Sequence, residues 1–117
     1  LIARGITLDL CPTSNVQAGI VASVADHPLA RLRRAGVRVS LSTDDTTVSD
    51  TLLSEEYVRA VEDIGLSLPE LWAIDRDGLA AAFAEPVLLG RLDESFRDWA
   101  ADIPELADHP IPGSAPA

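Results

Sequence analysis

Two stretches of the chain alternate apolar and polar side chains, which is typical of half-buried β-strands. The first covers residues 6–11 (Ile-Thr-Leu-Asp-Leu-Cys), and the turn-forming run at 12–15 (Pro-Thr-Ser-Asn) ends it. The second covers residues 37–41 (Val-Arg-Val-Ser-Leu). Between them a loop over residues 16–26 precedes a helix that Pro28 opens and Gly36 ends. Because parallel strands need a helical crossover of about this length, the order predicts a βαβ unit.

Downstream of the second strand, apolar positions recur with the spacing of a helix that ends at Gly65. Four apolar side chains share one face of this predicted helix: Leu53, Tyr57, Val61 and Ile64. Four acidic side chains are expected on the opposite, solvated face: Glu55, Glu56, Glu62 and Asp63. The pattern therefore predicts an amphipathic helix with an acidic outer surface.

Three further helices are predicted after Gly65. The run Ser67-Leu68-Pro69-Glu70 has the form of a capping box and opens the first of them. A short alanine-rich helix is expected at about residues 77–84, and the last runs from Pro86 to about residue 100. Four of the eight prolines fall at or after residue 104, which predicts an irregular tail over residues 101–117 that follows the structured segment 1–100.

Two strands against four or five helices leave the predicted sheet poorly covered. A two-stranded parallel sheet has both faces and both edges to cover, and parallel sheets lie buried inside larger folds. The remaining strands are therefore expected upstream of Leu1, outside this chain.

Composition narrows the class of partner. Nine basic residues stand against 19 acidic ones, and the net charge is −10. A surface this acidic repels phosphate backbones and anionic lipid, so neither nucleic acid nor a membrane is expected as a partner. Cys11 is the single cysteine, which fits a reducing, cytoplasmic compartment, and its apolar setting favours a buried, unreactive thiol.

The candidate chemistry lies in the polar run that follows the second strand. Asp44 and Asp45 come just past the C-terminal end of a parallel strand, where α/β barrels build their active sites. One carboxylate there could bind a cation such as Zn²⁺, while the other accepts a hydrogen bond from a ligand. Aspartates are also common in turns and helix caps, so on these residues alone that interpretation stays open.

Several motifs, in order, resemble the adenosine deaminase family. Residues 8–15 (Leu-Asp-Leu-Cys-Pro-Thr-Ser-Asn) resemble the Cys-Pro-x-Ser segment that follows the seventh barrel strand of that family. Residues 39–45 (Val-Ser-Leu-Ser-Thr-Asp-Asp) resemble the (Ser/Thr)-Asp-Asp segment that ends the eighth strand, and the resemblance covers roughly residues 5–100. It implies that this α/β chain is the C-terminal portion, meaning the last two strands and the following helices, of a (β/α)₈ TIM barrel.

The resemblance also implies a function for the complete barrel, namely zinc-dependent hydrolytic deamination of adenosine or a related 6-aminopurine nucleoside, with release of ammonia. Asp44 matches the carboxylate ligand of Zn²⁺, which also orients the attacking hydroxide, and is therefore the expected catalytic residue. Asp45 matches the substrate-binding residue that contacts N7 of the purine. The partners implied are the small aminopurine and the remainder of the barrel.

The chain departs from the pattern of the family in several places. Thr46 stands where a proline usually follows the two aspartates, so the substrate pocket is expected to differ, and Asp77 stands where a helix-capping asparagine is usual. The other metal ligands, a His-x-His pair and a further His, and the catalytic Glu are not in this chain. Neither His27, expected in a loop or at a helix start, nor His109 in the tail follows a strand. Because a catalytic zinc needs three protein ligands, the chain alone is expected to be inactive.

Two alternative functions stay open. Thr46 and Thr47 leave room for a relative that deaminates adenine or a modified, aminodeoxyfutalosine-like adenosine. A degenerate relative that has lost the metal site and acts as an acidic interaction module is the alternative from another class, and the retention of both aspartates argues against it. Ser14 has no His and acid around it, so a serine hydrolase is excluded. We expect Ser14 to form a cap or turn, or together with Asn15 to line the pocket wall.

Overall fold

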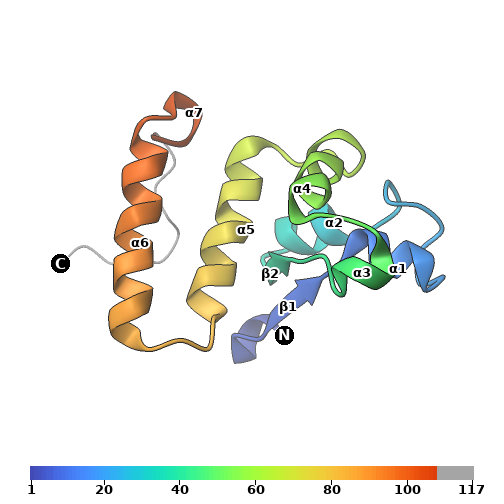
Figure 1. The fold of residues 1–117 in the computed structure, drawn as a ribbon, viewed down its shortest axis with the longest axis horizontal. Helices are drawn as coiled ribbons and strands as arrows, with labels where there is room; N and C mark the ends of the chain where they lie inside the picture. The colour runs from blue at the N-terminus through green and yellow to red at the C-terminus, as the bar shows by residue number, and fades with distance from the viewer. Residues whose placement is uncertain (108–117) are drawn as a thin grey trace.

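A two-stranded parallel sheet carries the fold of the computed structural model, which describes residues 1–107 (Figure 1). Strand β1 (Thr7–Leu10) pairs with β2 (Arg38–Leu41), and Leu10 stands opposite Leu41 in the register. Helix α2 (Leu29–Arg34) lies between the two strands in the chain. The strands and their helical crossover confirm the predicted βαβ unit.

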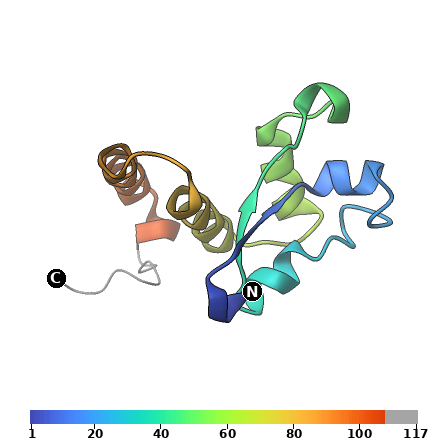
Figure 2. The same ribbon diagram turned by 90° about the horizontal axis from the view of Figure 1, so that it is seen from below.

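Around the sheet, the described residues form a 3₁₀ turn (Ile2–Arg4) and six more helices. These are α1 (Pro12–Gln17), α3 (Thr46–Ser49), α4 (Leu53–Glu62), α5 (Leu68–Ala81), α6 (Pro86–Ala101) and α7 (Pro104–Ala107). Helix α5 contacts both strands on one side, and α6 and α7 on the other. Two views at right angles show it between the sheet and α6 (Figures 1 and 2).

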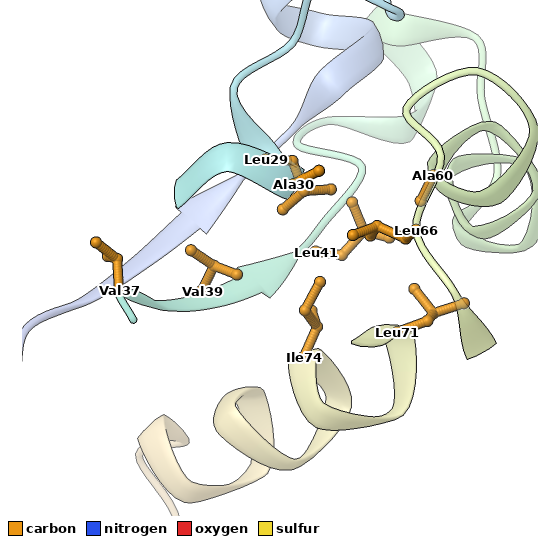
Figure 3. Close-up of a cluster of buried hydrophobic side chains, with 9 residues drawn as sticks. All are labelled: Leu29, Ala30, Val37, Val39, Leu41, Ala60, Leu66, Leu71 and Ile74. Atoms are coloured by element: carbon orange, nitrogen blue, oxygen red, sulfur yellow. The ribbon is translucent and has the colours of Figure 1, made fainter. Parts of the chain in front are cut away.

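The main hydrophobic core lies where the sheet, α2, α4 and α5 meet. Nine buried side chains form it, and Figure 3 shows them: Leu29, Ala30, Val37, Val39, Leu41, Ala60, Leu66, Leu71 and Ile74. Since side chains alternate along a strand, Val39 and Leu41 face this core while Ser40 turns to the other face of the sheet. There the Ser40 hydroxyl donates to Asp9 Oδ1 of the neighbouring strand at 2.8 Å.

A second, smaller cluster fixes the helices beyond α5. Trp72 of α5 is buried against Ala100 and Leu106, with Phe96 packed beside them. The segment predicted to be an irregular tail therefore contains α7 and a buried leucine within its first residues. Positions 108–117, His109 included, lie outside the described residues. Along residues 1–107, no helix combines the length and the apolar character that crossing a membrane requires.

The capping box at the start of α5 is confirmed, but the helix is longer than the sequence predicts. Glu70 Oε2 accepts from the Ser67 backbone at 2.8 Å, and Ser67 Oγ accepts from the Glu70 backbone at 3.3 Å. The predicted break before an alanine-rich helix at 77–84 is wrong, because α5 runs unbroken to Ala81. Asp77 is therefore inside a helix and caps none. It lies 3.8 Å from Arg33 in a salt bridge.

Two other helices also differ from the sequence-based predictions. Pro12 opens α1 where a turn was predicted, because a proline fits the first position of a helix. In α4, the prediction that Glu56 lies on the solvated face is wrong: its side chain is 0% exposed, like Ala60. Leu53 and Val61, predicted to face inward, are 47% and 42% exposed. The buried face of α4 is thus rotated relative to the predicted one.

Candidate functional site

The segments that follow β1 and β2 meet at the carboxyl edge of the sheet. Because the two strands are parallel and in register, Leu10 and Leu41 end side by side. The chain then enters α1 from β1, and it passes from β2 through a short polar loop into α3. This arrangement brings Ser14 of α1 against Asp44 of the loop, and their side chains are joined by a hydrogen bond.

Asp44 holds an uncommon backbone conformation at this edge. Its φ is +61°, in the left-handed region that residues other than glycine rarely adopt. Ser14 Oγ donates to Asp44 Oδ2 at 2.8 Å, while the side chain stays exposed. The hydrogen bonds formed within residues 1–107 leave Oδ1 available for a ligand. Asp50 adopts the same region at the end of α3, and aspartate tolerates it better than most residues, so the conformation orients the Asp44 carboxylate but does not by itself assign it a function.

Asp45 caps α3 and still presents one oxygen to solvent. Its Oδ1 accepts from the backbone N–H groups of Thr47 and Val48, both at 2.9 Å. In the described part of the chain no hydrogen bond reaches Oδ2. Thr46 is the first residue of α3, a position that accepts proline equally well, so the missing proline leaves the cap in place.

Ser14 and Asn15 turn to different partners. Asn15 Oδ1 lies 3.0 Å from His27 Nε2, and the Leu29 backbone donates to His27 Nδ1 at 3.3 Å. Because Nδ1 accepts, Nε2 carries the proton of a neutral imidazole, and burial lowers the pKa of His27 while the Glu56 carboxylate opposes the shift. His27 therefore stands at the start of α2, as the sequence predicts. Of the two residues expected at the pocket wall, only Ser14 contacts Asp44.

Cys11 joins β1 to α1 beside this loop. The thiol is half-buried, and burial raises its pKa, although the nearby Ser42 hydroxyl opposes the shift. A thiol with a raised pKa stays protonated at neutral pH and is a poor nucleophile. The raised pKa agrees with the unreactive cysteine that the sequence predicts, but the side chain is half-buried where the sequence predicts a buried one.

One wholly buried carboxylate, which the sequence pattern places on the solvated face, contacts both α1 and the segment after α3. Glu56 of α4 accepts from the Thr13 backbone at 3.1 Å through Oε2, and from Arg59 at 2.9 Å through Oε1. The helical spacing contains a signal for its burial, because Glu56 lies four residues before the buried Ala60 and next to Tyr57.

A separate cavity of about 250 Å³ opens between β2, α4, α5 and α6, and it does not include the two aspartates. It is lined by Ser40, Leu41, Tyr57, Ile74, Asp75, Gly78, Leu79 and Phe96. The Tyr57 hydroxyl donates to Asp75 at its wall, and burial raises the pKa of both groups. The polar side chains of its wall already have partners, Tyr57 with Asp75 and Ser40 with Asp9, so the candidate site remains the carboxyl edge.

The chemistry of Asp44 fits one position around a metal ion. A carboxylate oxygen is an ordinary ligand of Zn²⁺, and Asp44 offers Oδ1 at an exposed strand end. Across residues 1–107 no cluster of three or more His, Cys, Asp or Glu side chains could hold a metal ion. The described residues therefore do not form a complete metal site, and Asp44 could supply at most one of its ligands.

Comparison with known proteins shows which family the chain is similar to. The family model described as adenosine deaminase matches residues 1–94. The chain is 42% identical over 92 residues to an adenine deaminase of Rhizobium leguminosarum bv. trifolii (strain WSM2304), a match that covers 75% of this chain and 29% of that protein. It is 41% identical over 95 residues to an adenosine deaminase of Mycolicibacterium gilvum (strain PYR-GCK), over 80% of this chain and 26% of the relative.

The fold is similar to that of a solved N6-methyl-AMP deaminase from Arabidopsis thaliana. The TM-score is 0.79 at 34% sequence identity, and the match covers 87% of this chain and 30% of that structure. The chain thus spans less than a third of the length of each of these relatives.

Proposed function

The chain belongs to the adenosine deaminase family, and we propose that the protein containing it removes the 6-amino group of an aminopurine by hydrolysis, with release of ammonia. Its two strands and following helices correspond to the C-terminal part of the family's (β/α)₈ barrel. One observation carries the proposal: Asp44 and Asp45 lie side by side at the carboxyl edge of parallel strands, and each has one oxygen available. Active sites of such barrels are built at that edge.

We assign different roles to the two aspartates. Asp44 would hold a Zn²⁺ ion through Oδ1, while the hydroxyl of Ser14 keeps Oδ2 oriented. When bound, the ion supplies Lewis acidity that activates water at neutral pH. Asp45 would contact N7 of the purine through Oδ2, because its other oxygen is committed to the cap of α3. Since N7 and a carboxylate oxygen are both acceptors, this hydrogen bond requires one proton between them, carried by Oδ2 or by N7. The cap thus fixes the direction from which Asp45 meets the ring.

The substrate class follows from what these groups can recognise. Asp45 would read a purine nitrogen, which adenine, adenosine and N6-methyl-AMP share, and relatives named for deaminating each of these are similar to this chain. We propose adenosine or a related 6-aminopurine nucleoside. Adenine or a modified adenosine is the second candidate, favoured by the similarity to an adenine deaminase and by the exposed Thr46 and Thr47 beside Asp45.

The remaining parts of the site are assigned to the rest of the barrel. Because Asp44 is one ligand, the other ligands and the general acid would come from strands outside this chain. The single cysteine supports a cytoplasmic location. Against a degenerate, non-catalytic relative stands the retention of both Asp44 and Asp45 at the carboxyl edge, each with one oxygen available.

Two substitutions in the full-length protein test the roles separately. Asp44→Asn keeps a residue that tolerates the left-handed backbone but removes the charge, so metal content and kcat should both fall steeply. Asp45→Ser keeps a good helix cap but is too short to reach a purine. This variant should retain metal, and its kcat/KM should fall by an amount equivalent to about 2–4 kcal/mol of transition-state stabilisation, the range for one preorganised polar contact.

The matched control is Asp50→Asn. Asp50 ends α3 with a φ of +47°, so it receives the same substitution in the same kind of backbone without a proposed ligand role. Metal analysis and steady-state kinetics on several aminopurines give the readout. Full metal and near-normal turnover in both Asp44→Asn and Asp45→Ser would make these residues turn formers and refute the proposal.

A further inference from the structure

Glu56 lies at the centre of a buried polar network. Its side chain is 0% exposed, and both carboxylate oxygens accept hydrogen bonds. Oε2 accepts from the Thr13 backbone at 3.1 Å, and Oε1 accepts from the Thr13 hydroxyl and from Arg59 Nη1. The same Arg59 nitrogen donates to Thr13 Oγ1 at 2.7 Å and to Thr51 Oγ1 at 2.8 Å. The Glu56–Arg59 pair thus connects α4 to two other segments.

Each of those segments adjoins one of the two aspartates of the candidate site. Thr13 lies in the first turn of α1 and directly precedes Ser14, which donates to Asp44. Thr51 follows α3, the helix that Asp45 caps. A third link, from Gln17 Nε2 to the Ser49 carbonyl at 2.8 Å, ties α1 to α3 directly. The network therefore fixes the distance between α1 and α3.

We propose that Glu56 is a positioning residue for the deamination site, which sets the distance between Ser14 and Asp44 through Thr13, and the place of Asp45 through Arg59 and Thr51. The inference rests on the proposed function. Burying the Glu56 carboxylate is costly even beside Arg59, whose side chain is 32% exposed, and apolar side chains of similar volume often stabilise a fold as well or better. Its use here is geometric: one carboxylate fixes two loops that are far apart in the sequence.

The network also explains why a helix outside the carboxyl edge matters for that edge. A misplacement of about 1 Å in a catalytic group can lower turnover by on the order of 100-fold. Neither α1, with six residues, nor α3, with four, is long enough to hold its place by its own backbone bonds. The ten-residue α4 packs through Ala60 into the main core and supplies the rigid support.

The test uses variants of the full-length protein. Glu56→Gln keeps the shape of the side chain, but its amide cannot accept from both the Thr13 backbone and Arg59. Glu62→Gln is the matched control, since it is the same substitution at an exposed position of the same helix. Thr13→Val and Thr51→Val remove one hydroxyl on each side of the network.

We expect Glu56→Gln to lower kcat by on the order of tenfold or more, and Glu62→Gln to match the wild type. Thr13→Val should act mainly on kcat, through Asp44, and Thr51→Val mainly on KM, through Asp45. If Glu56 were merely structural, the same substitutions would lower the melting temperature, but they would not separate into one that affects kcat and one that affects KM. If Glu56→Gln lost stability but kept kcat and KM within about twofold of wild type, the inference would be overturned.

A crystal structure of Glu56→Gln gives a second readout that does not depend on activity. The hydrogen bond of 2.8 Å between Ser14 and Asp44 should lengthen or break. Its survival at that length, with α1 in place, would overturn the inference even if the wild-type protein proved inactive on every aminopurine. Wild-type inactivity by itself would count against the proposed function, so the two failures are distinguishable.

Discussion

Replacing Asp44 by glycine and by alanine separates the strain of its backbone from the work of its carboxylate. Both substitutions remove the hydrogen bond from Ser14, which contributes about 1 kcal/mol in a typical case. They differ in the backbone, because at a φ of +61° the Cβ of alanine is strained and glycine has none. Left-handed backbone costs an ordinary L-residue about 1–2 kcal/mol.

The extra freedom of glycine in the unfolded chain offsets roughly 0.5–1 kcal/mol of that difference. We therefore expect Asp44→Gly to be more stable than Asp44→Ala by about 1 kcal/mol. In a protein about three times the length of this chain, with an unfolding entropy of about 2.1 cal/mol/K per residue, this corresponds to a melting temperature higher by about 1–2 °C. Both variants should be equally inactive, because neither has a carboxylate.

The assay is calorimetric or denaturant unfolding of the full-length protein with metal removed by a chelator, so that metal binding does not add to stability. Asp50, with a φ of +47°, provides a reference pair: Asp50→Gly and Asp50→Ala should show the same order of stability with unchanged activity. An alanine variant at position 44 as stable as the glycine variant would refute the reasoning, since the left-handed backbone would then not be held there.

Two further predictions follow from the exposed apolar surface and from one ion pair. Expressed alone, residues 1–117 should self-associate, because large apolar side chains such as Phe83 and Val87 are fully or largely exposed. The isolated chain should also hold less than one equivalent of zinc after dialysis, because Asp44 is a single ligand. Sedimentation and metal analysis check this, and a monodisperse monomer with a cooperative thermal transition would contradict it. The hydrogen bond from Arg34 lowers the pKa of Glu70 from 4.5 to about 2, so the stability it contributes above pH 4.5 should be lost as the pH falls toward 2. Unfolding of wild type and Glu70→Gln should converge over that range, and a constant difference would rule the contribution out.

Regular patterns in the sequence were sufficient to predict most of the fold. Alternation predicts both strands, and the Ser67–Glu70 box and Pro86 predict where α5 and α6 begin. The four-residue α3 could not be predicted, because its turn of helix depends on the Asp45 cap and has no apolar stripe. The predicted break in α5 is wrong because the alanine-rich run continues the helix: alanine is the best helix former and does not interrupt one.

The candidate site was only half readable from the sequence. Asp44 and Asp45 stand in one motif, and their assigned roles stay predictions. The burial of Glu56 depends on Thr13 and Arg59, partners 43 residues before it and one helical turn after it. An acidic residue on a helix is ordinarily solvated, so its place on the inward stripe could not outweigh its charge until those partners were located.

The hydrogen bond between Asp9 and Ser40 favours the native register of β1 against β2. Sliding β1 along β2 by one residue would turn its apolar side chains away from the core, but a slide of two would leave them facing it. Only specific pairings distinguish that second alignment from the native one. It would break the Asp9–Ser40 bond and carry Ser14 about 7 Å along the sheet from Asp44, at roughly 3.3 Å per residue. The Asp9–Ser40 pair in the middle of the strands therefore stabilises the register that brings Ser14 to Asp44 at the carboxyl edge.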